Sequence, residues 1–151
     1  MSGRAGAVPR SVLRYPAMDK AAAIDDAEAK KAVFRRLVEL YALGDVSALS
    51  DLVAPDYVGH TALGDRNLDE FIQSIRHFHN LFVYAPDAFE IDDQFVEGDK
   101  VATRMTAHVQ VRATGEPVTL MGINLARIVD GRIVEEWNTW EQMQASKFYP
   151  G

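Results

Sequence analysis

The first half of the chain repeats its apolar residues with the spacing of a helix. Apolar side chains recur every three or four positions and form one broad stripe, made of Val33, Phe34, Leu37, Val38, Leu40 and Tyr41. Asp25 followed by Glu28 has the spacing of a capping box, and Gly44 is a typical helix terminator. The pattern therefore predicts a first helix between Asp25 and Gly44.

Two shorter helices are predicted after it. Asp45 can cap a helix that ends at Pro55, because the proline ring disfavours helical geometry at the preceding residue. Asn67 and Glu70 form a second capping box. The helix that follows it carries one apolar face, made of Phe71, Ile75, Phe78 and Phe82, and Pro86 closes this half of the chain.

From Ala88 onward the apolar spacing changes to alternation, which is typical of strands. Turn-forming residues divide this region into predicted strands at 88–96, 100–113, 118–129 and 132–140. Helices followed by such a meander predict an α+β fold, in which the helices cover one face of a curved, mixed or antiparallel sheet. This arrangement leaves a cone-shaped pocket suited to a small molecule.

Composition narrows the class of protein. The 151 residues are 48% hydrophobic and 25% charged, which is typical of one ordinary globular domain. A net charge of −6 disfavours nucleic acid as the partner, and no run approaches the ~18 apolar residues of a membrane span. The absence of cysteine excludes disulfides and thiolate zinc sites and is compatible with a reducing cytosol, so we expect a cytoplasmic protein.

The N-terminal segment is chemically separate from the rest. Residues 1–18 contain three arginines and no acidic residue, and two glycines and two prolines interrupt any helix there. The segment lacks the apolar core of a secretory signal. We expect residues 1–18 to be a flexible arm and residues 19–151 to be a single domain.

Two stretches of the chain resemble a known family. Residues 41–60, which read YALGDVSALSDLVAPDYVGH, and residues 122–138, which read GINLARIVDGRIVEEWN, are similar to the SnoaL-like polyketide cyclases of the nuclear-transport-factor-2-like superfamily. The resemblance implies a cone fold, a homodimer or higher oligomer, and cofactor-free chemistry on a hydrophobic substrate. The superfamily also contains ketosteroid isomerases, epoxide hydrolases, hydroxylation-associated enzymes and binding or assembly modules.

The chain departs from the family where the catalytic base is expected. The family commonly reads Glu-His-Trp-Asp after its final turn, and the last carboxylate is the base. Here the matching residues are Glu135, Glu136, Trp137 and Asn138. Because an amide cannot accept a proton near neutral pH, Asn138 can orient a carbonyl or a water while another group must titrate.

The residues that accompany Asn138 depend on the turn at Asp130 and Gly131. A two-residue type I′ turn would place Asn124 on the opposite face from Asn138. A three-residue turn with a glycine bulge would pair Ile128 with Arg132 and place Asn124 opposite Glu136. We favour the bulge, since it gathers Asn124, Glu136 and Asn138 on one face above a floor of three apolar residues, namely Ala126, Ile128 and Val134.

Glu136 is the first candidate for the catalytic base, because burial in an apolar cone would raise its pKa. His60, which the resemblance places near the pocket mouth, and His79, on the inner side of the third helix, are the alternatives. Asn138 completes the predicted catalytic set. The predicted substrate-binding residues are Asn124, Tyr41, Tyr57 and Trp140, although both tyrosines and Trp140 also suit core packing.

The sequence thus predicts proton transfer next to a carbonyl of a hydrophobic compound of secondary metabolism. A non-catalytic binding module, or an epoxide-hydrolase or hydroxylation-type relative, is the alternative. Known metal and nucleotide motifs are missing from the sequence, so we expect no metal and no cofactor. Ile123, Leu125 and Trp137 should lie on the outer face of the sheet and form the interface of a homodimer.

Overall fold

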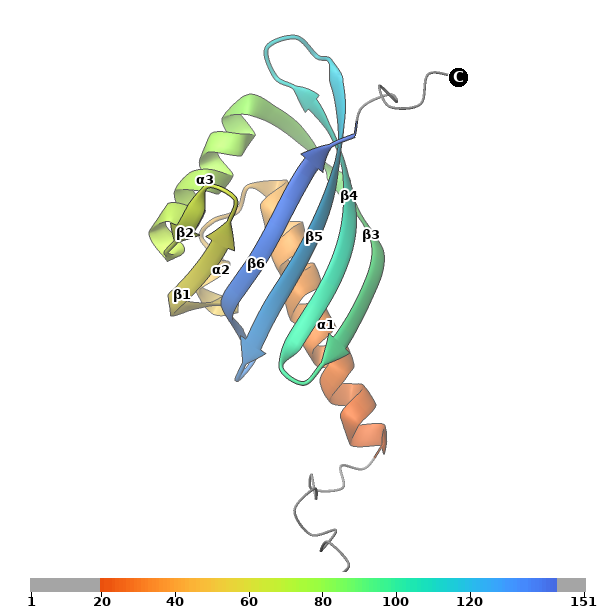
Figure 1. Cartoon of the computed structure of the whole chain (residues 1–151). Coiled ribbons are helices and arrows are strands. Elements are labelled where there is room, and N and C mark those ends of the chain that lie inside the picture. Colours follow the sequence, from red (N-terminus) through yellow and green to blue (C-terminus); the bar gives the residue numbers. More distant parts are fainter. Residues whose placement is uncertain (1–19, 144–151) are drawn as a thin grey trace, which may run out of the picture.

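Three helices and six strands make up residues 20–143, the part of the chain that this computed structural model describes (Figure 1). The predicted arm at residues 1–18 lies outside the described residues. Helix α1 spans Lys20–Leu43, α2 spans Leu49–Leu52 and α3 spans Leu68–Leu81. No helix within residues 20–143 is both long enough and apolar enough to cross a membrane.

Helix α1 begins earlier than its sequence pattern predicts. Asp25 and Glu28 lie inside the helix, and Glu28 forms an ion pair with Lys31 at 3.1 Å. The predicted capping box is therefore wrong, because acidic residues in helices also form pairs with bases three or four positions away. The capping box of α3 is confirmed: the Glu70 amide donates to Asn67 Oδ1 at 2.9 Å, and the Asn67 amide donates to Glu70 Oε1 at 3.2 Å.

Two prolines lie within strands instead of ending helices. Strand β1, Val53–Thr61, contains Pro55, and strand β3, Phe82–Glu97, contains Pro86. In both strands the pairing register shifts around the proline. Because proline has no amide hydrogen to donate, it interrupts the ladder locally while the strand continues beyond it.

The remaining strands complete one curved, unclosed sheet. They are β2 (Gly64–Arg66), β4 (Lys100–Val111), β5 (Pro117–Val129) and β6 (Arg132–Gln142). The strand order is β2-β1-β6-β5-β4-β3, with β1 parallel to β6 and all other neighbours antiparallel. The helices cover one face, as Figure 1 shows. The predicted α+β class and the mixed sheet are confirmed.

The sheet has a covered concave face and an uncovered convex face. The apolar core fills the space between the helices and the concave face, and its fully covered members include Phe34, Leu40, Phe71, Ile75, Val101, Met105, Ala126, Ile128 and Ile133. On the convex face Phe95, Ile123 and Leu125 are 60%, 48% and 39% exposed. The two faces of one sheet therefore differ in what covers them.

The turn between β5 and β6 differs from the favoured prediction. Asp130 and Gly131 have φ values of 51° and 76°, and Val129 pairs directly with Arg132, so the turn is a two-residue type I′ turn. The extra residue lies inside β6 instead, since Ile128 pairs with Ile133 but Arg127 pairs with Glu135.

This bulge at Val134 keeps Asn124 and Glu136 on the same face although the predicted turn is wrong. Asn124 now stands opposite Asn138, and Ala126 stands opposite Glu136. Ile133 occupies the floor position predicted for Val134 and is fully buried.

Candidate functional site

A buried carboxylate lies on the concave face of the sheet. Glu136 in β6 is 2% exposed. The Tyr57 hydroxyl donates to its Oε1 at 2.8 Å, and Asn124 Nδ2 donates to its Oε2 at 2.7 Å. Each carboxylate oxygen therefore has one protein donor and retains a further lone pair for a ligand.

Three neighbouring strands bring these groups together. Strand β6 lies between β1 and β5, and Glu136 stands beside Gly59 of β1 and Ala126 of β5. Tyr57 lies two residues before Gly59 and so points to the same face. A Cβ on Gly59 would collide with the Tyr57 hydroxyl and lie 2.9 Å from Arg66 Nε. The glycine therefore leaves room for the phenol and the guanidinium.

Arg66 supplies a positive charge behind Tyr57. Its Nε and Nη2 each lie 3.4 Å from the Tyr57 hydroxyl oxygen, and its guanidinium carbon lies 4.2 Å from the Phe71 ring centroid. Nη1 also donates to the Ser74 hydroxyl at 3.3 Å. Sequence reasoning missed Arg66, because nothing in the local pattern shows that a three-residue strand pairs it with Gly59.

The surroundings move two pKa values upward. Burial raises the pKa of Glu136, although the hydrogen bonds from Asn124 and Tyr57 and the charge of Arg66 oppose that shift. Burial also raises the pKa of Tyr57, and the Glu136 charge adds to the shift. Tyr57 therefore remains a neutral donor, while Glu136 accepts a proton more readily than an exposed glutamate.

Asn138 and Trp140 continue the concave face toward the end of β6. Asn138 is half-buried and stands opposite Asn124. The Trp140 ring lies flat on Gly122, where a Cβ would be 2.6 Å from three ring carbons, and it makes an edge contact with Phe89 at a centroid distance of 6.0 Å. The face thus changes from polar at Asn138 to aromatic at Trp140.

His60 lies on the other face of the sheet, away from the position predicted for it. Its Nδ1 is 2.8 Å from Asp65 Oδ1, its Nε2 is 2.8 Å from Glu135 Oε2, and its ring stacks on Trp137 at 5.2 Å. In β1 Tyr57 and Gly59 occupy buried, inward-facing positions, so the His60 side chain points outward. The structure therefore does not bring His60 to Glu136.

His79 and Tyr41 take part in an aromatic cluster near the ends of α1 and α3. The His79 Nε2 lies 2.6 Å from the Tyr41 carbonyl oxygen, and its ring is 4.6 Å from that of Tyr84. Tyr41 is 5.7 Å from Tyr84 and 5.6 Å from Phe89, again between ring centroids. Burial raises the pKa of Tyr41. These contacts fasten the helices to β3.

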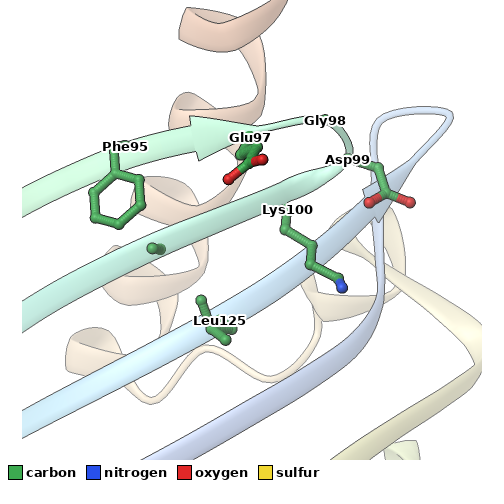
Figure 2. A pocket seen from close by; sticks show the side chains of 7 residues that line it. Phe95, Glu97, Gly98, Asp99, Lys100 and Leu125 are labelled. Atoms are coloured by element: carbon green, nitrogen blue, oxygen red, sulfur yellow. The ribbon is translucent and has the colours of Figure 1, made fainter.

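Glu136 is not among the residues that line either of two hollows on the surface of the part of the chain that the structure describes. One has a volume of about 440 Å³ and is lined by Phe95, Ala102, Leu125 and the Lys100 side chain, with Glu97, Gly98 and Asp99 at one end (Figure 2). The other has a volume of about 250 Å³ beside Gly44 and His79. Within residues 20–143, no group of three or more His, Asp or Glu side chains is arranged to hold a metal ion.

Helices packed on one face of a curved mixed sheet define the nuclear-transport-factor-2-like fold, and the buried carboxylate lies on its inner face. The chain belongs to the SnoaL-like polyketide cyclase family, whose sequence profile matches residues 31–147. A comparison with curated proteins gave no match.

Solved structures of several activities share the fold. IdmH from Streptomyces antibioticus, a candidate polyketide cyclase, is 28% identical with a TM-score of 0.65, and the match covers 74% of this chain and 91% of that one. An M. tuberculosis LEH-like epoxide hydrolase is 13% identical with a TM-score of 0.64 and coverage of 77% and 85%. A candidate ketosteroid isomerase from Kribbella flavida is 14% identical with a TM-score of 0.63 and coverage of 83% and 86%.

Proposed function

We propose that this protein catalyses cofactor-free proton transfer at the carbon next to a carbonyl of a hydrophobic, polyketide-type compound, with Glu136 as the base. The observation that carries the proposal is the burial of Glu136 between two donors on the concave face. Family membership supports this reaction class.

The proposed step breaks one C–H bond of the substrate. The proton moves to a Glu136 oxygen, and the electron pair of that bond forms an enolate with its charge on the carbonyl oxygen. The enolate then either recovers the proton at another carbon, as in an isomerisation, or attacks a second carbonyl, whose oxygen takes the proton from Glu136. In both cases Glu136 ends the cycle ionised.

Asn138 is suited to stabilise the enolate. It occupies the position of the family's carboxylate, two residues after Glu136 on the same side of β6, and its amide can donate a hydrogen bond to an oxyanion. A carboxylate at this position would repel that developing charge. The chain would thus have its base two residues before the position of the family's base, and an amide donor at that position.

The test compares two neighbouring glutamates in one assay. Exchange of the α-protons of a bicyclic aryl ketone for deuterium is followed by ¹H NMR with the wild type, Glu136→Gln and Glu135→Gln. We expect Glu136→Gln to slow the exchange by about 10²-fold or more, which is the usual contribution of a positioned base. Glu135→Gln is the matched control, because Glu135 lies on the convex face, and its rate should stay within about threefold of the wild type.

Three outcomes would contradict the proposal. Equal exchange rates with Glu136→Gln and the wild type would exclude Glu136 as the base, and a loss in both variants would show a structural effect. Absence of exchange with the wild type, together with binding of the ketone, would favour a non-catalytic binding module. Circular dichroism of each variant establishes that the fold is retained.

A further inference from the structure

A row of polar side chains crosses the concave face of the sheet, next to Glu136 and Tyr57. Gln94 in β3 pairs with Thr103 in β4, Thr103 pairs with Asn124 in β5, and Asn124 pairs with Asn138 in β6. The inward positions that flank this row on β4 and β5 are apolar or lack a side chain and are buried: Val101, Met105, Gly122 and Ala126. The four polar residues therefore form a band across the inner surface.

Two acceptors in this band lack a partner. Gln94 Nε2 donates to the Thr103 hydroxyl at 3.1 Å, and Asn124 Nδ2 donates to Glu136 at 2.7 Å, so the amide nitrogens are both engaged. The carbonyl oxygens of the same two side chains are buried and have no hydrogen-bond partner within the described residues. Leaving a buried acceptor unpaired costs free energy, which a ligand that donates to it would recover.

The orientation of the Asn124 amide is fixed by what its nitrogen contacts. A carboxylate can only accept, so Asn124 must direct its nitrogen toward Glu136 and keep its oxygen available. The Gln94 amide is held by Thr103, whose hydroxyl oxygen accepts from it. The band therefore presents acceptors, and a bound molecule has to supply the donors.

We propose that Gln94 and Asn124 form an acceptor pair that selects substrates with hydroxyl donors, and that Gln94 is a specificity-determining residue. This inference rests on the proposed function, since it assigns the substrate class of the same face. A phenol or enol O–H can donate a hydrogen bond to these carbonyl oxygens, whereas a ketone or ether oxygen has no donor and would be repelled by them. The expected substrate is a carbonyl compound with hydroxyl groups on the edge that lies over the band.

The test measures binding and needs no turnover. A dihydroxynaphthalene and its dimethyl ether, in which methyl groups replace the O–H donors, are titrated into the full chain by isothermal titration calorimetry. We expect the wild type to bind the diol about tenfold more tightly, which is the order expected for one or two recovered hydrogen bonds. In Gln94→Met, which keeps length and loses the carbonyl, the preference should fall by about fivefold while affinity for the ether stays within about twofold.

Two further variants keep the test decisive. Gln110→Met makes the same change at an exposed position of β4 and should retain the preference for the diol. Thr103→Val frees the Gln94 amide to rotate and should also lower the preference, which provides a second reading if Gln94→Met does not fold.

Equal affinity for the two compounds, no binding of either, or an unchanged preference in Gln94→Met and Thr103→Val would overturn the acceptor pair. These outcomes are distinguishable from failure of the proposed function. The preference can fail while proton exchange still depends on Glu136, and it can hold if Glu136 proves not to be the base.

Discussion

Glu135 and Glu136 are adjacent and chemically identical, yet they face opposite sides of the sheet and behave in opposite ways. Glu135 points to the convex face, where His60 first and Arg127 next hold its pKa below the ordinary range. Glu136 points to the concave face, where burial raises its pKa. Half-buried partners thus hold the pKa of one carboxyl down, while burial holds the pKa of the other up.

Both faces of the sheet carry apolar side chains, but the helices pack against the concave face alone. The concave face combines an apolar core with the polar band and Glu136, and it lies under the helices. The convex face carries an apolar row made of Phe95, Ala102, Leu125 and Trp137 in paired positions of four strands. The Lys100 ammonium lies 5.6 Å from the Trp137 ring centroid at the margin of this row. We propose that a second copy of the chain covers it and forms a homodimer.

The largest expected effect is a difference in folding between the same substitution at two adjacent residues of β5. Ala126 is fully buried beside Glu136, so Ala126→Glu would bury a second carboxylate without a partner and should prevent folding. Leu125 is 39% exposed on the convex face, so Leu125→Glu should keep the fold and disrupt the dimer. Circular dichroism reports the fold, and light scattering distinguishes the 16.8 kDa monomer from a dimer.

Two results would contradict this comparison of the concave and convex faces. A wild type that scatters as a monomer at micromolar concentration contradicts the dimer proposal, and a folded Ala126→Glu variant contradicts the packing described for the concave face.

An intermediate effect is expected where Trp140 lies on Gly122. A methyl group at this position would overlap the indole, so Gly122→Ala should destabilise the protein by roughly 1–3 kcal/mol and shift Trp140. Urea unfolding followed by tryptophan fluorescence measures both changes. The matched test is Gly122→Ala combined with Trp140→Leu: if removing the indole does not restore part of the loss, the contact is not its cause.

Much of the fold is predictable from the sequence because its signals are local. The alternation from Ala88 onward and the glycine turns gave the three long strands β4, β5 and β6, and the box of Asn67 and Glu70 marked the start of α3. Strand β1 and the beginning of β3 were not predicted from the residues. Pro55 and Pro86 are local signals against a strand, and only pairing with distant segments overrides them.

The site depends on long-range placement to a greater degree. Tyr57, Asn124 and Glu136 were candidates from the sequence, and the structure brings their side chains together. Asn124 and Glu136 lie on the same face of the sheet because of a bulge at Val134, and no residue near Val134 indicates a bulge. Arg66, Gln94 and Thr103 were missed, because their roles follow from cross-strand register and not from spacing along the chain.

The smallest expected effect is the contribution of His60, on the convex face, to the pH dependence of stability. Hydrogen bonds to Glu135 and then to Asp65 raise the pKa of His60 above its ordinary value of 6.5. A raised histidine pKa gives stability that is complete below 6.5 and is lost as pH rises through the higher folded value. Glu135, whose pKa is lowered, keeps its contribution throughout that range.

The melting temperature of the wild type should therefore fall slightly from about pH 6 to about pH 9, and His60→Gln should lose this component. His77→Gln, at an exposed histidine of α3, is the control. A pH profile that is identical in the wild type and His60→Gln would show that these hydrogen bonds add no net stability.

The most direct test of the central claim is the protonation of Glu136 itself. Side-chain carboxyl resonances are followed by ¹³C NMR across pH in the wild type and in Glu136→Gln, whose missing resonance assigns the inward glutamate; Glu135→Gln assigns the outward one in the same way. The account predicts that Glu136 titrates above its ordinary pKa of 4.5 and Glu135 titrates below it. A Glu136 midpoint at or below 4.5 would contradict the account, since the concave face would then hold an ordinary carboxylate.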